Sequence, residues 1–150
     1  MRILSAILAG LLLLTAPTPV AAETLVLTSS QIDLITGYCT PARGHLERLH
    51  SADALLRVNL GQRYENISTK LMAPLNSRVA LAGNDGVDMV KTTVDFNEEL
   101  TTFRELYLDY DNQMADVISM KCQDKPVEFY QQLEIARQKR TELNESVIKL

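Results

Sequence analysis

The sequence predicts an all-α protein: an elongated antiparallel helical hairpin with a third helix packed at its base. Two long stretches repeat apolar residues at alternating intervals of three and four, as a coiled-coil seam does. The strongest helix-breaking run after the N-terminal region, residues 82–86, separates them, and Cys39 and Cys122 lie almost equally far from it. No alternation of apolar and polar residues is long enough to build a sheet.

The first 22 of the 150 residues have the layout of a secretory signal peptide. Arg2 precedes an apolar run over residues 3–14, which two prolines and several small residues follow. The run is short for a bilayer span, and the small residues favour cleavage after Ala22 over a retained membrane anchor. We expect an exported protein of the periplasm, cell surface or extracellular space, with no membrane span in residues 23–150.

The charge balance argues against a nucleic-acid partner. The chain has 15 basic and 19 acidic residues, a net charge of -4, and loss of Arg2 with the signal peptide would make it -5 (14 minus 19). Nucleic-acid phosphates require clustered Lys and Arg, which this sequence lacks. We expect no nucleic-acid binding.

Residues 23–40 are expected to form a lead-in and a short helix, ahead of a helical domain over residues 41–150. Thr28 and Gln31 have the spacing of a capping box, so a helix should begin near Ser29. It should end near Thr36, because Gly37 and a proline at position 41 interrupt the pattern.

The first long helix should begin at Pro41, capped by Thr40, and end at the turn around Gly83. Pro74 should kink or loosen its last turns, because proline removes a backbone hydrogen bond. Asp53 is the only charged residue on its apolar seam. The apolar members are Ala42, Leu46, Leu49, Leu56, Leu60, Tyr64, Ile67, Leu71 and Leu75.

The second long helix should begin at Asp85 to Asp88 and end near Cys122. Its seam consists of Val90, Val94, Leu100, Phe103, Tyr107, Tyr110, Met114 and Val117. The third should begin at Pro126 and repeat by heptads. Its repeat contains Phe129, Leu133, Ala136, Arg140, Leu143, Val147 and Leu150.

The third helix is too short to cover the whole hairpin. At 1.5 Å per residue it measures about 37 Å against about 51 Å for the second helix, so it should run out near residues 96–98. In residues 71–94, which we call the tip, the two helices of the hairpin would then pack only against each other. Its apolar side chains form the expected contact surface for a protein partner or a second copy of the chain. They are Leu71, Leu75, Val79, Leu81, Val87, Met89 and Val90.

An even pair of cysteines in an exported chain is typically oxidised. Because residues equidistant from the turn face each other in an antiparallel pair, Cys39 and Cys122 should meet at the open end of the hairpin. A disulfide there closes a loop of 84 residues, counted inclusively. The loop-entropy model assigns such a bond about 4 to 5 kcal/mol of stabilisation.

Some residue patterns suggest catalysis or metal binding, but their spacing does not fit a catalytic or metal site. His45 and His50 lie about 140° apart around a helix, so they cannot converge on one tetrahedral ion. Glu47 and His50 form one Glu-x-x-His, but a di-iron bundle needs a second pair and two further glutamates. No nucleophile, phosphate loop or acid pair stands at a useful spacing. We expect no catalytic residue, metal or cofactor, and no enzyme activity.

The segment Leu27-Thr28-Ser29-Ser30-Gln31 resembles the LTxxQ motif of periplasmic stress proteins of the Spy and CpxP type. That resemblance implies a small exported helical protein that acts as an ATP-independent chaperone or stress-sensor inhibitor. The sequence departs from this family by lacking a second LTxxQ, by its two cysteines and by its acidic charge.

The layout from residue 23 onward is also similar to that of small uncharacterised exported helical proteins of candidate-phyla bacteria. The shared features are an early and a late Cys, an Arg-Tyr before an Ile, a Gly-x-Asp turn and an aromatic-led heptad helix. Here they are Cys39, Arg63-Tyr64-Glu65-Asn66-Ile67, Gly83-Asn84-Asp85, Cys122, and Phe129 through Leu133 to Ala136-Arg137. This resemblance implies an envelope or extracellular location and no specific activity.

These observations together predict an exported, non-enzymatic protein-interaction or structural module. The second reading is an ATP-independent periplasmic chaperone or stress protein.

Overall fold

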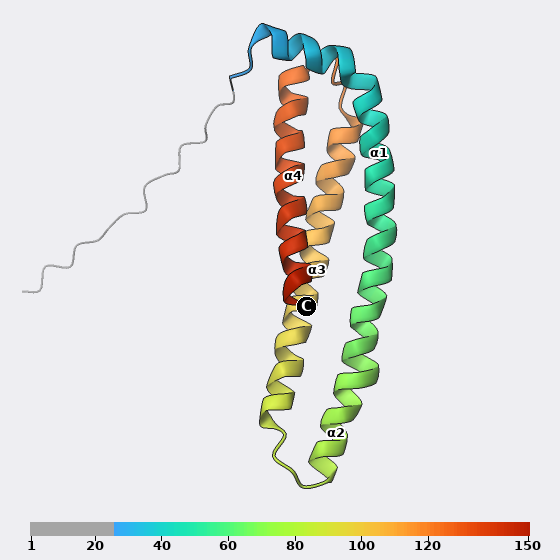
Figure 1. Cartoon of the computed structure of the whole chain (residues 1–150), viewed down its shortest axis with the longest axis vertical. Coiled ribbons are helices and arrows are strands. Elements are labelled where there is room, and N and C mark those ends of the chain that lie inside the picture. The colour runs from blue at the N-terminus through green and yellow to red at the C-terminus, as the bar shows by residue number, and fades with distance from the viewer. Residues whose placement is uncertain (1–25) are drawn as a thin grey trace, which may run out of the picture.

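The computed structural model describes residues 26–150, and it confirms the all-α fold class. Four α-helices and one π-helical segment make up this part of the chain, which contains no strand. The elements form a long, narrow rod (Figure 1). The predicted signal peptide, residues 1–22, lies outside the described residues.

Helix α1 runs without interruption over Ser29–Asn66. The capping box is confirmed: the Thr28 hydroxyl accepts from the Gln31 amide at 3.4 Å, and the Gln31 side chain accepts from the Thr28 amide at 2.8 Å. The predicted helix end at Thr36 and restart at Pro41 are wrong, since Pro41 lies inside α1. The helix instead bends: its first turns lie across the end of the rod before it follows the long axis (Figure 1). Proline removes only one backbone hydrogen bond, so a helix can bend there and continue.

Before Pro74, the chain widens into a π-helical segment, Ile67–Met72, and then continues as α2, Ala73–Leu81. Within this segment the Ala73 amide bonds to the Ser68 carbonyl, one residue further back than in an α-helix. A Schellman motif ends α2: the amide of Gly83 bonds to Ala80 and that of Asn84 to Val79. Gly83 has a φ of 69°, which glycine adopts without strain.

Helix α3, Val87–Ser119, returns along α1, and α4, Pro126–Lys149, packs along α3. The Asp85 side chain accepts from the first amide of α3 at 3.1 Å. Residues before the turn contact residues at a similar distance after it, so the two arms of the chain are antiparallel. These contacts are Asn76–Thr93, Ser68–Asn97, Asp53–Tyr110 and Cys39–Cys122.

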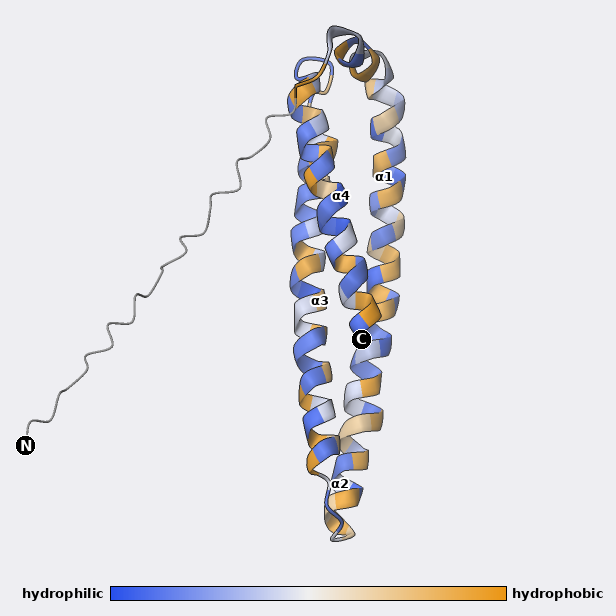
Figure 2. Cartoon of the chain, turned by 60° about the vertical axis from the view of Figure 1, so that its left-hand side comes forward, coloured by the Kyte–Doolittle hydropathy of each residue, from blue (hydrophilic) through white to orange (hydrophobic). Residues whose placement is uncertain are grey.

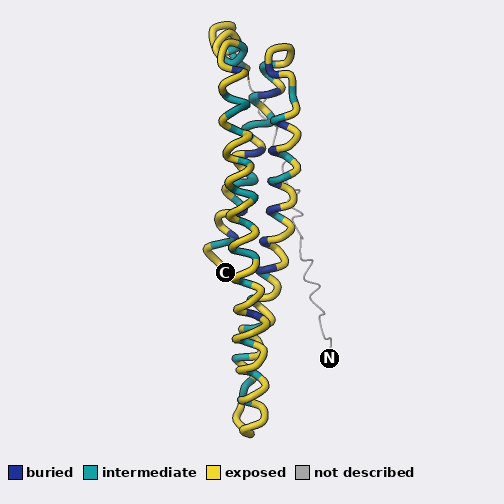
Figure 3. Tube along the Cα trace, turned by 90° about the vertical axis from the view of Figure 1, so that its right-hand side faces the viewer, coloured by how far each residue is buried: buried dark blue, intermediate teal, exposed yellow. Residues whose placement is uncertain are grey.

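The buried core lies mainly between α3 and α4 and spans only part of the rod. Most of the α3 positions predicted from spacing are buried, together with three of the α4 heptad positions. They are Leu100, Phe103, Tyr107, Tyr110, Met114 and Val117 on α3, and Phe129, Ala136 and Leu143 on α4. Buried residues, dark blue in Figure 3, are missing from the tip, where only exposed and intermediate residues occur.

Helix α1 is held less closely than its sequence pattern predicts. Leu46, Leu60 and Tyr64 pack against the core, and the Tyr64 ring meets the Phe103 ring edge-on at 5.7 Å. In contrast, Leu49 and Leu56 are exposed, although both lie on the predicted seam. The apolar face of α3 packs mainly against α4, and α1 makes fewer contacts with either helix.

Candidate functional site

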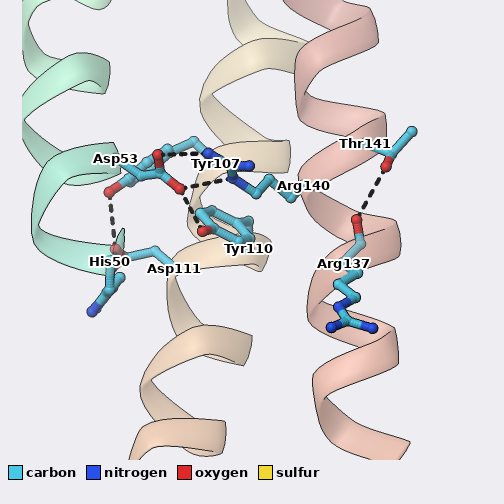
Figure 4. A network of polar contacts seen from close by, with 8 residues as sticks. All are labelled: His50, Asp53, Tyr107, Tyr110, Asp111, Arg137, Arg140 and Thr141. Atoms are coloured by element: carbon cyan, nitrogen blue, oxygen red, sulfur yellow. Dashed lines mark hydrogen bonds and ion pairs between the residues drawn. The ribbon is translucent and has the colours of Figure 1, made fainter. Parts of the chain in front are cut away.

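The apolar layer between the helices is interrupted at one level by an ion pair from two different helices. Asp53 on α1 receives two hydrogen bonds from the Arg140 guanidinium on α4, at 2.9 and 3.1 Å. Tyr110 on α3 donates its hydroxyl to the same carboxylate at 2.6 Å. One carboxylate therefore joins all three helices (Figure 4).

Burial and hydrogen bonding act in opposite directions on this carboxylate. The Asp53 side chain is 13% exposed and that of Arg140 is 43% exposed. Burial raises the pKa of Asp53, but hydrogen bonds from Arg140 and Tyr110 and the charge of Arg140 outweigh it, so this pKa is lowered. The bond to Asp53 raises the pKa of Arg140. Burial, followed by the bond to Asp53, raises the pKa of Tyr110.

A second cluster lies next to the first. Tyr107 donates its hydroxyl to Oδ1 of Asp111 at 2.9 Å. The same Asp111 oxygen lies 2.8 Å from Nε2 of His50 on α1. Burial, followed by the bond to Asp111, raises the pKa of Tyr107 to about 12. Arg57 stacks on the Tyr107 ring, with its Cζ atom 4.4 Å from the ring centroid.

Tyr107 and Tyr110 both lie on the apolar seam that spacing predicts for α3. Both side chains are almost fully buried, and each hydroxyl donates to an aspartate. Both oxygens of Asp53 already accept hydrogen bonds from within the protein. These hydrogen bonds link α1, α3 and α4 at one level of the rod.

The structure brings the two predicted disulfide residues together. Cys39 and Cys122 are bonded, with their Cα atoms 5.7 Å apart, and both are buried. The two histidines do not converge: His50 faces Asp111, whereas His45 lies 2.9 Å from Arg48 of its own helix. Within residues 26–150, no group of three or more His, Cys, Asp or Glu residues is arranged to hold a metal ion.

The predicted contact surface lies at the end of the rod opposite the disulfide. Five of its seven residues are exposed and the other two, Val79 and Met89, are partly buried. Hydrophobic residues, orange in Figure 2, continue along both helices to this end. A shallow apolar hollow also lies there, between α2 and α3, with Leu75 and Met89 among its walls.

Polar residues connect the two helices near and within the tip. Ser68 donates to Asn97 at 2.6 Å, and Asn76 donates to Thr93 at 2.8 Å. Five apolar residues of the tip are exposed, whereas Val79 and Met89 are partly buried. An isolated helical hairpin is stabilised when its apolar residues lie between the helices. The tip therefore keeps apolar surface available that its own fold does not use.

The sequence analysis did not predict the Asp53–Arg140 pair or the hydrogen bond that Tyr110 donates to it. A signal was present: each charged residue is the exception on an otherwise apolar seam. Opposite charges on two apolar seams predict a cross-helix pair once the register between the helices is fixed.

Within the described range, 26–150, none of the helices combines the length and hydropathy that crossing a bilayer requires. In comparisons with protein-family models, with curated proteins and with solved structures, the chain matches none.

Proposed function

We propose that this protein is a non-enzymatic interaction module of the cell envelope or extracellular space, and that it presents the tip to a protein partner. The observation that carries the proposal is the apolar surface that the tip leaves exposed. Polar side chains join its two helices, while Leu71, Leu75 and Val90 stay 61, 45 and 50% exposed. Contiguous exposed apolar surface on a soluble domain is typical of protein contact sites.

The division of the rod supports the same proposal. The disulfide and the Asp53 network lie in the part covered by α4, and the tip lies beyond it. A rigid base with an uncovered apolar end suits a protein that holds a contact surface away from its own core. The N-terminal residue pattern and the oxidised cysteine pair support export.

The experiment replaces the tip residues with polar ones and compares the partners recovered by crosslinking in the native cell. The variant is Leu71→Gln/Leu75→Gln/Val90→Thr. The matched control is Leu55→Gln/Val58→Thr/Leu108→Gln, because these side chains are 66, 47 and 50% exposed but lie outside the tip. We expect the tip variant to lose partners that the control retains. An unchanged set of partners in the tip variant would exclude the proposal.

The second candidate is an ATP-independent periplasmic chaperone. Exposed apolar side chains outside the tip, among them Leu55, Leu108 and Ile148, favour it, as does the LTxxQ resemblance around Thr28. A chaperone would suppress aggregation of unfolded clients at equimolar ratio without ATP. No suppression at severalfold excess would exclude this candidate and leave the first one intact.

A further inference from the structure

A hollow of about 120 Å³ lies beside the Asp53 network, where α1 packs loosely against α3 and α4. Its walls are mostly apolar and come from all three helices, with Leu60, Phe103 and Leu143 among them. Asp53, Arg57 and Arg140 also line it and are the charged residues among its walls. An apolar cavity of about 150 Å³ is known to hold a benzene molecule, so this hollow fits an apolar body of about six carbons.

The charges around the hollow leave one cation without an anionic partner. Asp53 and Arg140 neutralise each other through two hydrogen bonds. Arg57 forms no ion pair and no side-chain hydrogen bond within residues 26–150; it only stacks on Tyr107. The lining therefore carries a net charge of +1, from Arg57 and Arg140 less Asp53.

Stacking also prepares Arg57 to bind an anion. The Tyr107 ring occupies one face of the guanidinium, and the Tyr107 hydroxyl is itself fixed by Asp111. Stacking leaves the N–H groups at the edge of the guanidinium available. Two of these N–H groups can bond the two oxygens of one carboxylate. The remaining polar residue of the wall, Asn144, is exposed.

We infer that this hollow binds a small organic monocarboxylate, with the apolar body between α1 and α4 and the carboxylate on Arg57. An inorganic anion would leave the apolar walls uncovered, and a cation would meet the unpaired charge of Arg57. This site is separate from the tip and does not depend on the function proposed for it.

The test titrates the purified oxidised protein with hexanoate at pH 7 and follows amide and arginine side-chain NMR signals. The expected dissociation constant is on the order of 1 mM, given eight non-hydrogen ligand atoms. Shifts should concentrate at Arg57, Leu60 and Leu143. Hexylamine and inorganic phosphate serve as comparison ligands and should bind at least tenfold more weakly.

Arg57→Gln should weaken hexanoate binding at least tenfold, and Arg57→Lys, which keeps the charge without the planar fork, should weaken it less. Arg63→Gln on the same helix is the control and should bind as the wild type does. Far-ultraviolet circular dichroism and thermal unfolding establish that each variant is folded. Three results would overturn the inference: no saturable shift at ten times the expected dissociation constant, equal binding of hexylamine, or unchanged hexanoate binding in folded Arg57→Gln.

Discussion

Asp53 and Arg140 each occupy a position where neighbouring residues form an apolar seam, and each supplies the partner that the other needs. A buried ion pair adds little net stability, because desolvating two charges is costly. Removing Asp53 is costly, however, since it leaves the buried Tyr110 hydroxyl without an acceptor and the half-exposed Arg140 without its partner. A displacement of α1 along α3 and α4 would separate Asp53 from both Arg140 and Tyr110, so we propose that the network fixes the register of the helices.

This role predicts non-additive mutations. Asp53→Leu should lower the free energy of unfolding by about 2 to 3 kcal/mol, because Arg140 and the buried Tyr110 hydroxyl both lose their acceptor. Asp53→Leu/Tyr110→Phe/Arg140→Met removes all the polar groups together and should recover at least half of that loss. Urea unfolding measures both values. A triple variant no more stable than Asp53→Leu would contradict this account.

The lowered pKa of Asp53 predicts a stability change in acid. The folded protein holds this carboxyl in its ionised form, so its pKa lies below the ordinary value of 3.8. The resulting stabilisation is fully present at pH values above the ordinary pKa of 3.8, and it is lost as the pH falls through the folded-state pKa. Asn at position 53 cannot ionise. The stability difference between wild type and Asp53→Asn should therefore be constant above about pH 5 and shrink in stronger acid. Unfolding curves at several pH values measure it, and a difference independent of pH would refute the prediction.

At the residue scale, spacing alone predicted much of the core but not the network. Leu100 through Val117 recur at intervals that put them on one side of α3, and that side faces α4. Such periodicity describes one helix and does not say how that helix is placed along its neighbour. The Asp53–Arg140 contact joins residues 87 positions apart, and it depends on the relative translation of two helices, which neither periodicity specifies.

At the scale of elements, boundaries were less predictable than the elements themselves. Gly37 and Pro41 both disfavour an α-helix, yet α1 continues through them. Local propensity is a weak constraint when tertiary contacts hold both sides of a break. Here Ile35 and Leu46 pack against the core on either side and Cys39 is bonded to Cys122, so the helix bends and does not end.

The same disulfide connects the start of α1 to the chain between α3 and α4, and its removal should be costly. Cys39→Ser/Cys122→Ser opens a loop whose ends are 83 positions apart. The chain-entropy model gives a loss of about 4 to 5 kcal/mol in the free energy of unfolding. Urea unfolding of the double variant against the oxidised wild type measures this loss. A loss below about 1 kcal/mol would mean that the bond does not constrain the unfolded chain as that model requires.

On the scale of the whole molecule, the length of α4 divides the rod. Alongside α4, three helices share a buried core, the ion-pair network and the disulfide. Beyond it, Asn76 and Thr93 join the two helices of the tip, and five of the seven apolar residues of the predicted contact surface are exposed. The sequence predicted this division from helix lengths. It could not predict the polar contacts inside the tip, because these depend on which faces of the two helices meet.

Site-specific photocrosslinking in the native cell tests whether the tip binds a protein partner. A photoreactive residue is placed at Leu75 in the tip and, as the comparison, at Leu55 on the α4-covered part of α1. We expect a discrete crosslinked product from position 75 and none from position 55. The same products from both positions, or none from position 75, would contradict this expectation.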